Sequence, residues 1–317
     1  MSDPHDDYDD DGDSAPALTD APARKALGQH FLFDPSILKR AANAAGPVKG
    51  QTVIEVGPGP GGLTRAILNE EPALLIAVET DPRFSEALLS WPEAKSGKLQ
   101  VIAKDARKVH WEKVLTEAGA ATPVMIIANL PYNVGTPLLI DWLKAGDWRG
   151  PMALMFQKEV ADRICAKPDT DAYGRLAVIS QAVTRPRIAF TLPPGAFRPP
   201  PKVDSAVVAF EPLPPGQRFE HLALLEQIAG AAFGQRRKML RAALKPFAKK
   251  RGMKAEAWLE ECGIDPTARA ETLTQAEFRT LASSLASASP SSARTWSSRS
   301  SWRSRLRRSV SRMRLRR

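Results

Sequence analysis

The feature that most constrains the fold is a glycine-rich turn between an apolar run and a helix. The run Thr52–Val56 is short and rich in β-branched residues, which is typical of a buried strand of a parallel sheet. Gly57, Gly59 and Gly62 then match the pattern G-x-G-x-x-G, and a helix is expected over Leu63–Leu68. Because glycine has no Cβ, the backbone of such a turn can approach a ligand closely. On its own, the turn fits NAD and S-adenosylmethionine about equally well.

Acidic residues follow the next two predicted strands. The second strand, residues 73–78, ends at Glu79, and the third, Leu99–Ala103, is followed by Asp105. Ligands of parallel sheets bind beyond the carboxyl ends of the strands. We therefore expect Glu79 to accept both ribose hydroxyls of an adenosine, and Asp105 to accept from an adenine amino group. The alternatives are a solvated acid at the strand end for Glu79 and a turn or N-cap residue for Asp105.

The fourth predicted strand, residues 123–127, runs into Ala128-Asn129-Leu130-Pro131-Tyr132. The asparagine offers one acceptor and two donors on a flat amide, the proline fixes φ, and the tyrosine supplies a flat ring with a polar edge. Together they could hold a planar heterocycle with an amino group, such as adenine. The alternative is a simple turn, because such residues after a strand often form only that.

A proline-rich segment precedes the last predicted strand, residues 206–210. Its prolines stiffen the loop, which could hold the ring of Phe197 in a fixed place. A hydrophobic plug under the loop explains this phenylalanine about as well. The alternation of strands and helices up to residue 212 predicts a doubly wound, Rossmann-like α/β sheet over residues 24–212.

Residues 213–286 are predicted to form a small helical domain. Helices are expected over residues 219–233, 236–247, 254–261 and 275–286. The second of these brings together Arg236, Arg237, Lys238 and Arg241, and residues 235–251 contain no acid. Such a basic helical face can follow a phosphate backbone, although a solvated face is the usual meaning of a charge run.

Charge and cysteine content indicate the kind of partner and the compartment. Residues 1–23 contain eight Asp and no Lys or Arg, and residues 287–317 contain ten Arg and no acid, so a disordered leader and a disordered tail are expected. The tail is either a basic RNA-binding arm or a terminus without a function. The net charge of +10 suits an acidic partner such as nucleic acid. Cys165 and Cys262 are the only cysteines, which predicts neither a disulfide framework nor a metal site and fits the cytoplasm; no membrane span is expected.

The ordered motifs, taken together, resemble those of the rRNA adenine dimethyltransferase family, and look closest to its bacterial small-subunit branch. The resemblance covers roughly residues 24–282. The motifs that carry it are Gly28-Gln29-His30-Phe31-Leu32, Glu55-Val56-Gly57-Pro58-Gly59-Pro60-Gly61, Glu79, Asp105, Asn129-Leu130-Pro131-Tyr132, the segment 197–205 and Phe233-Gly234-Gln235-Arg236-Arg237-Lys238. The family usually has Asn at the position of His30, and an imidazole can replace one hydrogen bond of that amide but not both.

The resemblance implies an S-adenosylmethionine-dependent enzyme that dimethylates N6 of two adjacent adenosines near the 3′ end of 16S rRNA, with a role in subunit biogenesis. It further implies that Tyr132 and Phe197 sandwich the target base, while Asn129 and the Leu130 carbonyl hold its amino group. A monomer is expected, with the small ribosomal subunit as partner. The implied cofactor contacts are His30, Leu32, Gly57, Glu79, Asp105 and Asn129.

Three other readings remain open at the level of sequence. Within the family, the alternative is a 23S rRNA methyltransferase of the macrolide-resistance type. Pro58, Pro60 and the stretch Phe233–Lys238 argue against it, because they resemble the small-subunit branch. An NAD-dependent dehydrogenase fits the glycine turn but leaves the Asn129–Tyr132 stretch unexplained. A ribosome assembly factor without catalytic activity would share the fold and the RNA partner.

Overall fold

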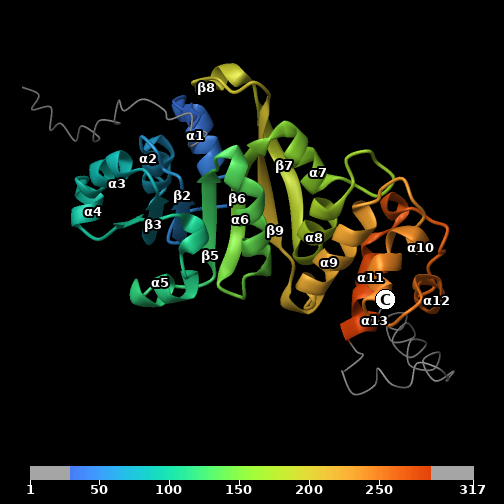
Figure 1. Ribbon diagram of the computed structural model, residues 1–317. Coiled ribbons are helices and arrows are strands. Elements are labelled where there is room, and N and C mark those ends of the chain that lie inside the picture. The colour runs from blue at the N-terminus through green and yellow to red at the C-terminus, as the bar shows by residue number, and fades with distance from the viewer. Residues whose placement is uncertain (1–28, 287–317) are drawn as a thin grey trace, which may run out of the picture. The chain divides into compact units, whose positions relative to one another are not determined.

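The computed structural model in Figure 1 describes residues 29–286, so the expected leader and tail lie outside the described residues. The chain divides into two compact units, one ending at Arg218 and the other beginning at Phe219. The expected boundary lies six residues earlier. Residues 213–218 stay with the first unit because the Leu213 amide donates to the Val183 carbonyl (2.9 Å) and Arg218 forms an ion pair with Asp147 (2.8 Å).

The first unit is built around a seven-stranded sheet with the strand order β4-β3-β2-β5-β6-β9-β7. Strands β2 to β6 pair in parallel, whereas β9 runs antiparallel to both of its neighbours. All five residues of β2 are buried, as an apolar run in a doubly wound sheet requires. The strands are β2 (Thr52–Val56), β3 (Leu74–Glu79), β4 (Leu99–Ala103), β5 (Val124–Asn129), β6 (Arg149–Gln157), β7 (Thr184–Leu192) and β9 (Ser205–Pro212).

Eight helices of this unit lie between the strands, among the residues that the structure describes. Three of them follow β3 and β4 and were not assigned from the sequence. Their ranges are α1 (Pro35–Ala42), α2 (Gly62–Leu68), α3 (Pro82–Leu89), α4 (Pro92–Lys95), α5 (Trp111–Glu117), α6 (Tyr132–Lys144), α7 (Lys158–Cys165) and α8 (Arg175–Val183).

Two helix starts show how local sequence fixes the elements around the strand ends. At α1, the carboxylate of Asp34 accepts hydrogen bonds from the amides of Ser36 (2.8 Å) and Ile37 (3.2 Å), as expected for an N-cap followed by proline. Helix α6 (Tyr132–Lys144) begins at Tyr132, with Pro131 at its N-cap position. The Asn129–Tyr132 stretch therefore links a strand directly to a helix N-terminus.

Two segments far apart in the chain form a short two-stranded ribbon. Strand β1 (Phe31–Leu32) pairs antiparallel with β8 (Phe197–Arg198), so that Phe31 lies opposite Arg198 and Leu32 opposite Phe197. Leu32 and Phe197 join the core cluster that α1 and α2 form with one face of the sheet. The ribbon ties the leading segment to the proline-rich loop.

The second unit is a small helical domain in which α9 packs against α13. Phe233 and Phe278 stack at the contact, with ring centroids 5.7 Å apart. No helix spans residues 236–247, contrary to the prediction, because the amides of Leu240 and Arg241 donate to carbonyls of residues 266–268, and Pro246 has no amide to continue a helix. The helices are α9 (Leu222–Phe233), α10 (Leu240–Ala243), α11 (Lys245–Lys249), α12 (Ala255–Glu261) and α13 (Gln275–Ala286).

Within residues 29–286, none of the helices is both long and apolar enough to cross a membrane.

Candidate active site

A cleft lies at the carboxyl ends of β2, β3 and β5 and the loop after β4. The cleft is open to solvent. Of the sequence-predicted site residues, the cleft brings together His30, Gly57, Glu79, Asp105, Asn129, Leu130 and Tyr132.

The backbone conformation of the turn favours glycine at two positions, and at Gly59 there is also no room for a side chain. Gly57 and Gly59 have φ angles of +73° and +53°, which side chains rarely allow. A Cβ on Gly59 would lie 2.7 Å from the ring of Phe31, and one on Gly57 would lie 3.6 Å from the Asn129 carbonyl oxygen. The turn can therefore present its backbone to a ligand only as glycine.

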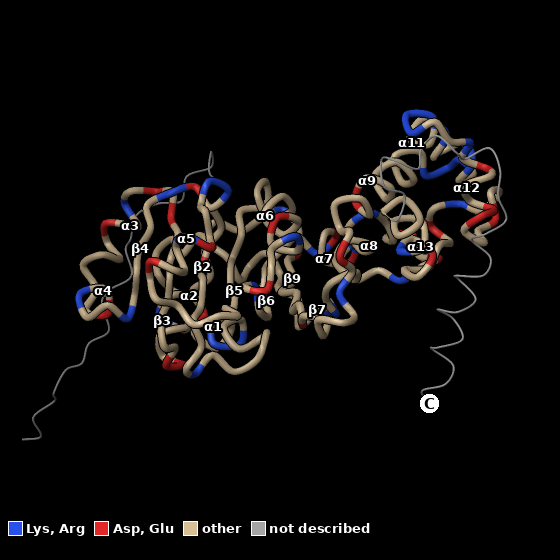
Figure 2. Tube along the Cα trace, turned by 90° about the horizontal axis from the view of Figure 1, so that it is seen from below, with Lys and Arg blue, Asp and Glu red and all other residues tan. Residues whose placement is uncertain are grey.

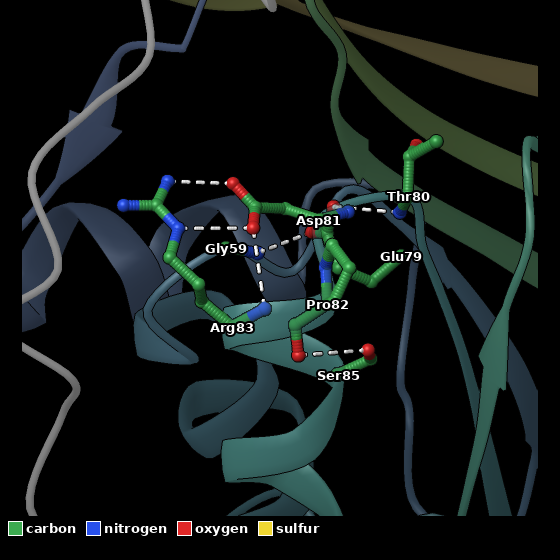
Figure 3. Close-up of polar contacts among 7 residues, drawn as sticks. All are labelled: Gly59, Glu79, Thr80, Asp81, Pro82, Arg83 and Ser85. Atoms are coloured by element: carbon green, nitrogen blue, oxygen red, sulfur yellow. Dashed lines mark hydrogen bonds and ion pairs between the residues drawn. The ribbon is translucent and has the colours of Figure 1, made fainter.

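Glu79 ends β3 with its carboxylate bound by backbone amides, as Figure 3 shows. Its Oε1 accepts from the amides of Thr80 (2.7 Å) and Asp81 (2.8 Å), and its Oε2 accepts from Gly59 (3.0 Å). Burial raises the pKa of this carboxyl, partly offset by the three amides. A carboxylate has about four lone-pair sites, so one is left. About one acceptor site on Glu79 is thus free for a ligand group.

Asp105 is both a cap and a candidate ligand-binding group. It caps a 3₁₀ turn by accepting from the Arg107 amide (3.0 Å), and it binds the Arg107 guanidinium through Nε (3.1 Å) and Nη2 (2.7 Å). These hydrogen bonds from Arg107 hold the pKa of Asp105 below its usual range, so the group is a carboxylate. By the same count, about one acceptor site is left for an amino group.

The side chain of Asn129 has a fixed orientation. Its Nδ2 donates to the His30 carbonyl oxygen (2.9 Å), which can only accept. That bond directs the amide so that Oδ1 is the atom left for a ligand. Asn129 therefore presents an acceptor, which is what an exocyclic amino group needs.

Tyr132 is held at both its ring and its hydroxyl. The His30 ring stacks on it, with centroids 5.5 Å apart and an angle of 28° between the planes. The Tyr132 hydroxyl lies 2.7 Å from the hydroxyl of Ser205, which is fully buried at the start of β9. Nδ1 of His30 in turn lies 2.8 Å from the Pro199 carbonyl oxygen. One face of the tyrosine ring is thus covered by His30.

Two predicted site residues, Phe197 and Leu32, are not among the residues that line the cleft. Phe197 is only 2% exposed and lies in the core cluster with Leu32, which is 5% exposed. The pairing of β8 with β1 directs both side chains inward. The sandwich of Tyr132 and Phe197 is therefore absent, and the alternative of a plug under the proline loop matches the structure.

The basic residues of the helical unit differ in their environment. Figure 2 shows Lys and Arg positions near α11 and also in other parts of this unit. Arg236, Arg237 and Lys238 lie in a turn and not on a helix. Arg236 forms an ion pair with Glu271 (2.9 Å) and Arg241 one with Glu256 (3.1 Å). Arg237 and Lys238 are exposed, without an ion-pair partner in the described part of the chain.

Sequence analysis missed two residues that organise the site, Arg107 and Ser205. The spacing Asp105-Ala106-Arg107 is a signal that could have revealed the first, since an Asp N-cap and a basic residue two positions later meet readily. Ser205 ends the segment 197–205 that carries the family resemblance, but no local pattern predicts its bond to Tyr132, which spans 73 residues. Within residues 29–286, no group of three or more His, Cys, Asp or Glu could hold a metal ion.

Comparisons with known proteins agree on one family. A family model described as "Ribosomal RNA adenine dimethylase" matches residues 21–287. A "Ribosomal RNA small subunit methyltransferase A" from Maricaulis maris is 49% identical over 267 residues, which covers 84% of this chain and 91% of the relative. One of the same name from Sinorhizobium medicae is 50% identical over 266 residues, covering 83% and 93%.

Two solved structures share the fold. A dimethyladenosine transferase from Plasmodium falciparum has a TM-score of 0.67 at 24% identity, covering 80% of this chain and 96% of the other. The 23S rRNA methyltransferase ErmE has a TM-score of 0.58 at 23% identity, covering 81% and 99%. The Rossmann-like methyltransferase fold predicted from the sequence is thereby confirmed.

Proposed function

Because the chain belongs to the ribosomal RNA adenine dimethylase family, we propose that it methylates N6 of two adjacent adenosines in the 3′-terminal hairpin of 16S rRNA. The methyl donor is S-adenosylmethionine, and each adenosine receives two methyl groups. The observation that carries the proposal is that Asn129 lines a cleft with groups suited to an adenosine cofactor, while its Nδ2 is engaged by the His30 carbonyl and its Oδ1 is left as an acceptor.

The residues of the cleft fit S-adenosylmethionine. Glu79 and Asp105 each keep about one acceptor site, which suits a ribose hydroxyl and the adenine amino group. The glycine turn at Gly57 offers close approach to the methionine end. When bound, S-adenosylmethionine supplies an electrophilic methyl group on a sulfonium centre.

The chain contributes to the reaction mainly by orientation. An exocyclic adenine nitrogen is a poor nucleophile, because its lone pair is delocalised into the ring. Asn129 Oδ1 and the Leu130 carbonyl would accept its two N–H groups and favour a tetrahedral nitrogen with the lone pair directed at the methyl group. No strong general base is required, since the nitrogen becomes acidic once it is methylated and then loses its proton.

Tyr132 would bind the target base by stacking. His30 covers one face of its ring, so the base would use the other face, and the proposed stack runs His30, Tyr132, adenine. The adenosine must first leave its RNA stack to enter the site.

The helical unit would bind the surrounding rRNA, as part of a role in subunit biogenesis in the cytoplasm. Arg237 and Lys238 are its best candidates for phosphate contacts, since both are exposed and without ion-pair partners among residues 29–286. Arg236 and Arg241 are engaged by carboxylates and would contribute less. We expect the enzyme to act as a monomer.

The test is transfer of labelled methyl groups to unmethylated small ribosomal subunits, followed by digestion and identification of the modified base. Dimethyladenosine in 16S rRNA is expected. Asn129→Ala should lower the rate of methyl transfer by about 10²- to 10³-fold, the usual cost of removing one preorganised polar contact to the reacting group, with subunit binding retained. Labelling of large-subunit RNA instead would point to the 23S reaction. Subunit binding without methyl transfer would point to an assembly factor.

A further inference from the structure

One aromatic ring stands out on the surface of the first unit. In the described part of the chain, four large apolar side chains are clearly exposed, and Phe33 is the only aromatic one among them, with 38% of its surface accessible. The guanidinium of Arg198 lies over this ring, 5.6 Å from its centroid. Arg198 is itself exposed and has no carboxylate partner among residues 29–286. We refer to these two residues as the Phe33–Arg198 platform.

The platform lies next to the candidate active site. Arg198 is in β8, opposite Phe31 of β1, and Phe33 directly follows β1. His30, which lines the cleft and stacks on Tyr132, is three residues before Phe33. Three residues of extended chain span at most about 10 Å. A nucleotide beside a base held at Tyr132 can cover that distance.

The chemistry of the platform fits an unpaired nucleotide. Flat aromatic rings and guanidinium planes are the surfaces on which single-stranded bases stack, and the guanidinium can also bind a phosphate. The carboxylate nearest in sequence, Asp34, accepts hydrogen bonds from Ser36 and Ile37 at the start of α1. Asp34 therefore binds the start of α1 and forms no ion pair with Arg198 within residues 29–286.

We propose that the Phe33–Arg198 platform binds an unpaired nucleotide that flanks the target adenosine, with the base stacked on Phe33 and a phosphate on Arg198. This inference rests on the proposed function, because it takes RNA as the substrate. It adds a contact close to the reacting base, separate from the basic residues of the helical unit. Such a contact would help to keep the target strand open while the adenosine is in the site.

The experiment compares variants in methyl transfer to, and equilibrium binding of, unmethylated small subunits. Phe33→Ala and Phe33→Leu should each weaken binding by about 5- to 150-fold, which corresponds to one lost stacking contact of ~1–3 kcal/mol. Phe33→Trp should bind like the wild type, because it keeps a flat ring. Arg198→Ala should lower the salt dependence of binding by about one unit of log–log slope. Leu89→Ala is the matched control, since Leu89 is 53% exposed on α3.

All variants should keep the wild-type melting temperature and S-adenosylmethionine affinity. The inference is overturned if the Phe33 variants bind like the wild type. It is equally overturned if Phe33→Leu is normal while Phe33→Ala is weak, because that pattern indicates an apolar contact, as with a ribosomal protein. If the wild-type protein transfers no methyl group to small subunits, the proposed function itself is wrong. The wild type alone shows this, so the outcome is distinct from a failure of the platform inference.

Discussion

Glu55 is an acid in the middle of the apolar sheet, two residues before the glycine turn. It is fully buried in β2, and burial raises its pKa from 4.5 to about 8. The nearby Thr64 hydroxyl lowers this pKa and the Glu79 carboxylate raises it, each by less than burial does. As pH rises through 4.5, the unfolded chain loses this proton while the folded chain keeps it. The folded state then binds more protons, so Glu55 destabilises the fold increasingly between about pH 4.5 and pH 8.

Glu55→Gln should remove this penalty, because glutamine has nearly the shape of the neutral acid. With pKa values of 4.5 unfolded and about 8 folded, linkage gives a penalty of about 0.8 kcal/mol at pH 5 and about 4 kcal/mol at pH 7.5. The stability of the variant relative to the wild type should therefore rise by about 3 kcal/mol between these two pH values.

Urea unfolding of both proteins at a series of pH values measures this difference directly. Glu86→Gln serves as the control, since Glu86 lies exposed on α3. The reasoning is refuted if the stability difference between Glu55→Gln and the wild type does not change with pH, which would mean that Glu55 is ionised inside the sheet at neutral pH.

Three further predictions concern the glycine turn, the tyrosine and the basic turn. Gly59→Ala should cost about 1–2 kcal/mol of stability, because φ is +53° there, and should weaken S-adenosylmethionine binding; an unchanged urea midpoint would contradict this. Ser205→Ala should lower the single-turnover rate about tenfold by freeing the Tyr132 hydroxyl, a loss of ~1–1.5 kcal/mol, with cofactor affinity unchanged; an unaltered rate would count against it. Arg237→Ala should weaken small-subunit binding and its salt dependence more than Arg236→Ala, whose side chain is ion-paired; equal effects in a filter-binding titration would argue otherwise.

The sheet could be predicted because its signals are local. The third predicted strand, Leu99–Ala103, agrees residue for residue with β4, and the run Thr52–Val56 agrees with β2. Both are short apolar runs bounded by turn residues. The hydrophobic pattern and composition of a few residues are enough to predict such strands. Asp34 was likewise recognisable as an N-cap from the proline that follows it.

The helix predicted over residues 236–247 failed because a distant segment competes for its backbone. Its charged residues have good helix propensity, but the amides of Leu240 and Arg241 bond to the carbonyls of Ala268 and Pro266. Hydrogen bonds between segments more than 20 residues apart cannot be predicted from a short stretch of sequence. The basic face expected on that helix is consequently a turn with both paired and unpaired cations.

Phe197 shows a limit of motif reasoning at the site. A ring on a stiff loop can stack on a base or fill the core, and the residues around it look the same in both cases. The pairing of β8 with β1 determines that Phe197 fills the core, because it buries Phe197 against Leu32. Strand β1 begins about 165 residues earlier in the chain. The backbone position of Tyr132, in contrast, is set locally, because Tyr132 closely follows the end of β5 and starts α6, while its side chain is held by the distant residues His30 and Ser205.

His30 explains how the site can depart from the usual family residue without losing its geometry. The bond that orients Asn129 goes to the backbone carbonyl of His30, so it does not depend on which side chain stands there. An asparagine at this position would keep that bond, but only a ring can also cover Tyr132. The imidazole additionally reaches the Pro199 carbonyl and so joins the leading segment to the proline loop. The histidine therefore keeps the backbone contact that orients Asn129, and its ring stacks on the tyrosine that we propose binds the base.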